Sequence, residues 1–262
     1  MCIRMGTVQR LPLSQTLSAL IWSELRAMSR TWRAVLWTSA VPVLILLLGE
    51  AQIPANLRKS PVPTLEIVAL AVTVGVFALA LFGYSTSLAT YRERGVFDRL
   101  RCAPVGPGQL LGARLVAQMV AVALQGIVVL AVAWLVYHAV PTRLDLAPLV
   151  VVWVLGGLCA LALGQMVVAL TRRAGEAVAA ARLILITVFL LSGTFVSVER
   201  WPGWLRTLAS WSPVNLLEHL LTRTLLGHPL GWDVFGARLL ALGAWAALLA
   251  LVGTVFFRWD RA

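Results

Sequence analysis

The sequence predicts an all-α, polytopic membrane protein with six transmembrane helices. Hydrophobic residues make up 60% of the 262 residues and only 13% are charged, whereas soluble domains are about 45–50% apolar and about 25% charged. The apolar residues form long runs that approach the ~20 residues needed to cross a bilayer. The formal net charge of +11 comes mainly from arginines between these runs, which indicates membrane topology and not nucleic-acid binding.

The first segment, residues 1–33, is predicted to be a cytoplasmic N-terminus with an amphipathic helix in the membrane interface. Apolar residues recur at helical spacing from Leu13 to Met28. Glu24 and the nearby arginines make this stretch a poor span. The alternative is that this stretch is the irregular cytoplasmic beginning of the first span and not a separate interfacial helix. No cleavable signal sequence is evident among the first residues.

A single membrane domain is predicted over residues 34–257, with a cytoplasmic tail at 258–262. The expected spans are 34–49, 65–90, 115–137, 146–170, 179–198 and 235–257. The first is short, and Pro42 is expected to kink it. No internal repeat or linker divides the domain.

The distribution of arginine predicts that both termini are cytoplasmic. Arginines gather in the N-terminal segment and in the connections after the second and fourth spans, whereas the opposite loops contain few. The positive-inside rule places the arginine-rich side in the cytoplasm. An even number of spans agrees with this orientation.

The external segment 199–233 is predicted to form two short helices that dip into the outer leaflet. Its large apolar residues share one helical face: Trp201, Trp204, Leu205, Leu208 and Trp211. Pro202 suits the first turn of a helix, Pro213 ends it, and tryptophan favours the membrane interface. A surface hairpin that only anchors the chain is an equal alternative.

Residues for ATP hydrolysis, catalysis or metal binding are not found. The one lysine, Lys59, has no glycine pattern before it, whereas a P-loop needs GxxxxGK[ST]. The histidines and cysteines lack the spacing of a metal site. We therefore expect neither catalysis nor a metal. Glu218 beside His219 leaves a membrane enzyme acting on lipids as an alternative.

The spans contain few polar side chains. Gln125 and Gln165 are candidates for lining a transport pathway, with hydrogen bonding between helices as the alternative. The lack of carboxylates at membrane depth argues against an ion-coupled carrier. Gly156, Ala160 and Gly164 form a row of small residues that predicts close helix packing.

The most informative local pattern is the cytoplasmic segment 91–104, between the second and third spans. Gly95 and Pro104 bound a stretch with charges of both signs and an apolar edge that includes Phe97 and Leu100. A short amphipathic helix of this kind suits a groove on a soluble partner. A solvated loop is the alternative.

This segment resembles the motif of ABC-2 permeases. The matching residues are Glu93, Arg94, Gly95, Asp98, Leu100 and Pro104. Asp98 replaces a usual glutamate, and Val96 and Ala103 replace usual threonines. A second resemblance covers 191–195, then Trp201-Pro202-Gly203-Trp204-Leu205 and Ser212-Pro213. The drug-resistance and polysaccharide-export branch is the most similar.

The resemblance implies a coupling helix that binds a separate P-loop ATP-binding subunit. Its residues would be Glu93, Arg94, Gly95, Phe97, Asp98, Arg99, Leu100 and Pro104. A re-entrant external pair is also implied, with Trp201, Pro202, Gly203, Trp204, Trp211 and Pro213.

The same resemblance implies the composition of the complex. Two permease copies, identical or paired with a paralogue, would lie on two ATP-binding subunits, which alone bind ATP and Mg. The complex would export a drug, lipid or lipid-linked glycan through the bacterial cytoplasmic membrane. A non-transporting anchor or immunity protein that recruits an ATPase remains an alternative.

Overall fold

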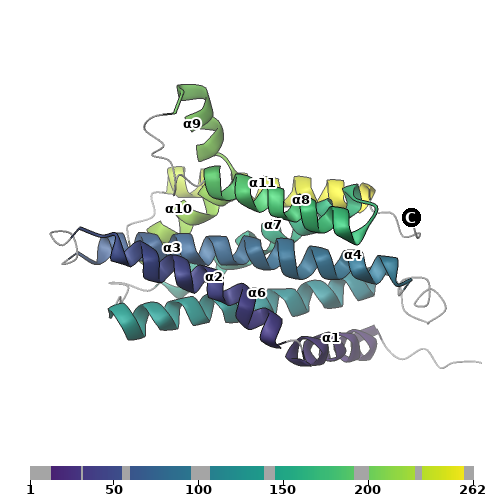
Figure 1. Ribbon diagram of the computed structural model, residues 1–262. Coiled ribbons are helices and arrows are strands. Elements are labelled where there is room, and N and C mark those ends of the chain that lie inside the picture. Colours follow the sequence, from purple (N-terminus) through teal and green to yellow (C-terminus); the bar gives the residue numbers. More distant parts are fainter. Residues whose placement is uncertain are drawn as a thin grey trace, which may run out of the picture.

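The computed structural model describes residues 13–30, 32–54, 60–95, 107–138, 145–191, 201–227 and 232–256. Within these ranges the regular structure is helical, without a strand. The helices are α1 (Leu13–Arg30), α2 (Trp32–Ala51), α3 (Pro61–Ala78), the π-helix η1 (Leu79–Ser85), α4 (Thr86–Glu93), α6 (Pro107–Tyr137), α7 (Leu146–Leu170), α8 (Ala174–Leu191), α9 (Gly203–Ser210), α10 (Pro213–Leu225) and α11 (Trp232–Val255). The long helices lie side by side in one bundle (Figure 1).

Four helical stretches are long and apolar enough to cross a membrane. They are Val62–Glu93, Gly112–Tyr137, Leu146–Leu170 and Val234–Val255, and they correspond to the second, third, fourth and sixth expected spans. The expected first span overlaps α2, which has a shorter apolar stretch at Ser39–Ala51. The expected fifth overlaps α8. The count of six therefore stays a prediction.

The stretch Val62–Glu93, called span two below, forms the centre of the bundle. In its most apolar window 78% of the residues are buried within the protein, compared with 11% for Val234–Val255. Its N-terminal half, α3, contacts α2, α6 and α10, and its middle, η1, contacts α7 and α8. The helix begins at Ser60, whose hydroxyl accepts a hydrogen bond from the Val62 N–H. Span two is therefore surrounded mainly by protein.

The middle of span two, η1, packs so closely against α7 that the backbones of the two helices are in contact. A Cβ atom added to Gly164 would lie only 2.6 Å from the carbonyl oxygen of Ala80. At Gly156, a Cβ would meet the side chain of Leu217 on α10. Glycine at these two positions of the small-residue row thus allows α7 to approach both elements. A π-helix is a wider turn that often occurs at functional sites.

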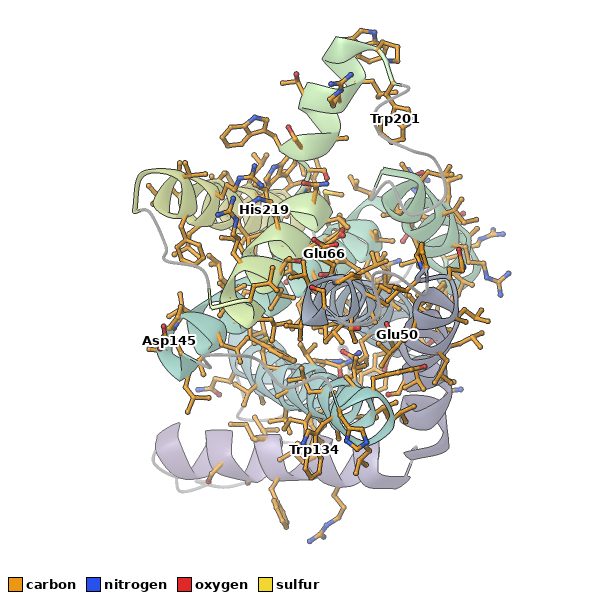
Figure 2. All side chains as sticks on the ribbon, turned by 90° about the vertical axis from the view of Figure 1, so that its left-hand side faces the viewer. Glu50, Glu66, Trp134, Asp145, Trp201 and His219 are labelled. Carbon is orange, nitrogen blue, oxygen red and sulfur yellow. The ribbon has the colours of Figure 1, made fainter. Side chains whose placement is uncertain are left out.

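Helix α1 crosses the bundle instead of running along it. Its axis lies across the direction of the long helices, and it contacts α6 (Figures 1 and 2). Trp22 is exposed, and the guanidinium carbon of Arg26 is 5.8 Å from the centre of its ring. This orientation suits an interfacial helix.

The two short helices α9 and α10, predicted to be external, differ in their packing. Helix α10 contacts α3, α7 and α11 and buries most of its leucines, whereas α9 projects from the bundle (Figure 1). On α9, Trp204 is 71% exposed. The indole N–H of Trp245 donates to the Trp211 carbonyl at 2.9 Å, which fastens the α9–α10 junction to α11. Whether the pair enters the outer leaflet stays a prediction.

Candidate coupling site at the end of span two

Three of the predicted coupling residues lie where α4 ends. Glu93 and Arg94 are exposed and Gly95 is buried; Gly95 has a φ of 63°, which glycine adopts without strain. The Gly95 N–H donates to the Arg92 carbonyl at 3.1 Å, so the chain turns off the helix axis here. The other predicted residues, Phe97, Asp98, Arg99, Leu100 and Pro104, lie outside the described ranges.

Arg92, one turn earlier, binds the C-terminal end of α7. Its guanidinium donates to the carbonyl oxygens of Val168 at 2.9 Å, Thr171 at 2.7 Å and Arg172 at 2.9 Å. The last carbonyls of a helix have no partner within the helix and bear partial negative charge. Arg92 is only 4% exposed, so a buried cation caps the C-terminal end of α7.

Glu93 binds the start of the next helix. Its Oε1 accepts a hydrogen bond from the backbone N–H of Ala174, the first residue of α8. Glu176 accepts from the N–H groups of Arg172 at 2.8 Å and Arg173 at 3.2 Å. The opposite charges of Arg92 and Glu93 thus face the two helix ends that favour them. We call residues 171–173 the α7–α8 turn.

Arg114 joins the beginning of α6 to the same end of span two. Its guanidinium carbon lies 4.1 Å from the ring centre of Tyr91 and 6.0 Å from that of Tyr84, within the range of cation–π attraction. It also donates to the hydroxyl of Ser87. Because α4 and α6 flank residues 96–106, both sides of the predicted coupling segment are fixed to one another.

Sequence reasoning missed the roles of Arg92 and Arg114, which it counted only as topology charges. The acceptors of Arg92 are 76 to 80 residues away in the chain. No local spacing points to them. The available signal was the position of Arg92 in the last turn of an apolar helix, where a charge needs a partner.

The two glutamines proposed for a pathway are buried between helices. Gln125 of α6 is 1% exposed, its amide lies against Gly75 of α3, and no described residue bonds to either amide atom. Gln165 of α7 lies against Gly253 of α11. Their place in a pathway stays a prediction.

A second cluster of polar side chains lies at the end of the bundle opposite to Arg92 and Glu93, where Figure 2 shows Glu66 and His219. Burial, followed by the charge of Glu66, raises the pKa of Glu218 to about 7. Burial, followed by Arg238 and Arg223, lowers the pKa of His219 to about 4.

This cluster of polar side chains around Glu218 gives little support to the alternative of a membrane enzyme. Glu218 and His219 are consecutive in α10, and consecutive side chains on a helix do not face each other. Among the described residues no group of three or more histidine, cysteine or acidic side chains could hold a metal ion.

Comparisons with known proteins agree with the family that the motif at residues 93–104 predicted. The family model described as "ABC-2 type transporter" matches residues 15–226. "Probable multidrug ABC transporter permease YbhR" of Escherichia coli strain K12 is 28% identical over 150 residues, which is 57% of this chain. The protein of the same name in strain O157:H7 gives the same values. The chain spans 39% of the length of these relatives.

Proposed function

Because the chain belongs to the ABC-2 type transporter family, we propose that it is the membrane-spanning permease subunit of an ATP-driven exporter. A separate P-loop ATP-binding subunit, in two copies, binds ATP and Mg²⁺ and supplies the energy. A second permease copy or a paralogue completes the complex. Both termini face the cytoplasm of a bacterial cell.

The observation that best supports this function is the end of span two. Arg92, Glu93 and Arg114 fasten α4 to α6, α7 and α8, and the chain leaves this anchored end at Gly95. Residues 96–104 then begin at a fixed point on the surface predicted to be cytoplasmic. A partner that binds this segment can therefore act directly on several helices.

The proposed cargo is hydrophobic or amphipathic: a drug, a lipid or a lipid-linked glycan. The four candidate spans contain few charges, which favours apolar contacts over recognition of an ion. The name of the Escherichia coli relatives, a multidrug permease, supports the drug class. Gln125 and Gln165 are proposed to contact the cargo in a conformation other than the one described.

The test is reconstitution with a P-loop ATP-binding subunit in lipid vesicles. Wild-type complex should assemble and export at least one member of a drug, lipid and glycan panel when ATP is present. Replacing Phe97, Asp98 and Leu100 with serine should abolish assembly or transport, because apolar anchors supply most interface energy. The control is Leu208→Ser, an exposed apolar position on α9, which should assemble normally.

Other outcomes would support the alternatives. Normal assembly and transport by the triple serine variant would remove the coupling role of residues 96–104. ATPase association without transport of any cargo would support a membrane anchor. Lipid modification in the absence of an ATPase subunit would support an enzyme, and replacement of His219 should then abolish it.

A further inference from the structure

The structural feature with the most specific consequence is the pair Arg92 and Glu93. These consecutive residues hold both sides of the α7–α8 turn: Arg92 binds the carbonyls that end α7, and Glu93 binds the N–H that begins α8. Two residues later the chain turns at Gly95 towards the predicted coupling segment. The turn between two other helices is thus attached directly to the base of that segment.

We propose that Arg92 and Glu93 are positioning residues that transmit movement of segment 96–106 to α7 and α8. The inference rests on the proposed function, because it assumes that an ATP-binding subunit moves this segment. It assigns Glu93 to contacts within the permease and not to the ATPase interface. Movement at the coupling segment therefore moves the α7–α8 turn as well as α4.

The bonds of Arg92 are suited to transmitting force. Hydrogen bonds from a charged donor are about twice as strong as neutral ones, and Arg92 makes three of them at a site that water hardly reaches. The planar guanidinium reaches several carbonyls at once. A lysine ammonium is a point charge on a flexible stem and cannot reproduce that arrangement.

The packing of α7 extends the movement to the rest of the bundle. Helix α7 lies along α11 and also contacts η1 and α10. A displacement of the α7 end near Arg92 should therefore also displace α11, which contacts α7 along the bundle, and α10, which contacts α7 at its other end. Arg114 keeps the beginning of α6 with α4, so both flanks of the coupling segment move together.

The experiment compares Arg92→Gln, Arg92→Lys and Glu93→Gln with wild type in the reconstituted complex. Arg92→Gln should still bind the ATP-binding subunit and keep basal ATP turnover. Its cargo-stimulated ATPase and transport should fall by at least about fivefold, the lower end of typical coupling between sites. Arg92→Lys, which keeps the charge, should be intermediate and guards against a folding defect in the glutamine variant.

Arg173→Gln, a further variant, and Glu93→Gln separate the proposed role from simpler ones. Arg173→Gln removes an exposed positive charge from the same turn and leaves the Arg92 bonds in place, so coupling should be normal. Glu93→Gln keeps an oxygen that can accept from Ala174 while losing the charge. It should bind the ATPase subunit normally, and loss of that association would overturn the assignment of Glu93.

A distance measurement provides a readout that a purely stabilising role would not change. Gly112 and Gly175 are exposed and have no atom within 4 Å of an added Cβ, so cysteine-linked spin labels are tolerated there in a background without the native cysteines. In wild type the distance between these labels should be the same with and without trapped ATP. In Arg92→Gln it should change on ATP binding, because α8 no longer follows α4 and α6.

The outcomes distinguish this proposal from the proposed function. If wild type neither assembles with an ATP-binding subunit nor transports, the proposed function fails. If wild type transports and Arg92→Gln has normal stimulated ATPase, transport and label distances, only the role of Arg92 and Glu93 is overturned.

Discussion

The contact between α7 and η1 leads to a quantitative prediction for Gly164→Ala. The new Cβ would lie 2.6 Å from the Ala80 carbonyl oxygen, well below the 3.4 Å at which ordinary contact begins. A backbone oxygen in a helix cannot rotate away as a side chain can, so the two helices must separate. Overpacking of this kind costs about 1–3 kcal/mol.

The matched control is Gly243→Ala in α11, where the nearest atoms to an added Cβ are 4.0 Å away on Leu155. Both substitutions replace a glycine within a helix and gain similar helix propensity, up to about 1 kcal/mol. That gain cancels when the two variants are compared. Gly164→Ala should therefore be less stable than Gly243→Ala by about 1–3 kcal/mol.

The assay is thermal unfolding of the purified chain in detergent, followed by circular dichroism. One kcal/mol corresponds to about 2–4 °C for chains of 150–250 residues, so the difference between the variants is measurable. Equal melting temperatures for Gly164→Ala and Gly243→Ala would refute the backbone contact between α7 and η1.

Three further predictions concern other regions. Gln125→Met should raise the melting temperature, because an apolar side chain replaces a buried amide without partners among the described residues; a lower value would show that the amide is bonded. Burial favours protonated Glu218 and neutral His219 in the folded protein. Glu218 therefore stabilises the fold increasingly as pH falls from about 7 to 4.5, whereas His219 stabilises it increasingly as pH rises from about 4 to 6.5. The two effects oppose each other in the wild type. Glu218→Gln should therefore make melting temperature rise with pH over this window, and His219→Gln should make it fall; two flat profiles would contradict the burial of both groups. In intact cells an impermeant thiol reagent should label Trp204→Cys but not Gly175→Cys in a background without native cysteines, and labelling at 175 would reverse the topology.

The long helices were predictable from hydropathy. The expected span 146–170 coincides with α7 at Leu146–Leu170, and the expected span 65–90 lies within span two. Runs of apolar residues set these positions because lipid and protein interior both favour them. The expected span 115–137 likewise lies within the candidate span Gly112–Tyr137. Helix α6 itself begins earlier, at Pro107, because Gln109 and Arg114 interrupt the apolar run without interrupting the helix.

The details of the coupling site were less predictable. The motif at residues 93–104 correctly indicated the family, but a pattern of matching residues does not reveal which side chains face inward. Arg92 and Glu93 bind backbone groups of α7 and α8, and backbone acceptors leave no trace in the sequence of those helices. The π-helix at Leu79–Ser85 likewise has no distinct residue pattern in this chain.

The hydroxyl groups along span two bear on how the protein is inserted during synthesis. Four of them bond to a carbonyl four residues earlier in the same helix: Thr73 to Ala69, Ser85 to Leu81, Thr86 to Phe82 and Thr90 to Thr86. These four groups therefore need no later helix as a partner, so they do not oppose the entry of span two into lipid before α7 is synthesised. A polar group without a partner would cost several kcal/mol there.

Arg92 differs from these four residues, because its carbonyl acceptors belong to residues 168–172. Until those residues are synthesised, its guanidinium must stay among water and lipid head groups. The nascent chain is thereby prevented from sliding deeper into the bilayer. The same arginine can bind the α7–α8 turn only after that turn has been synthesised, so this contact between α4 and α7 forms after span two is complete.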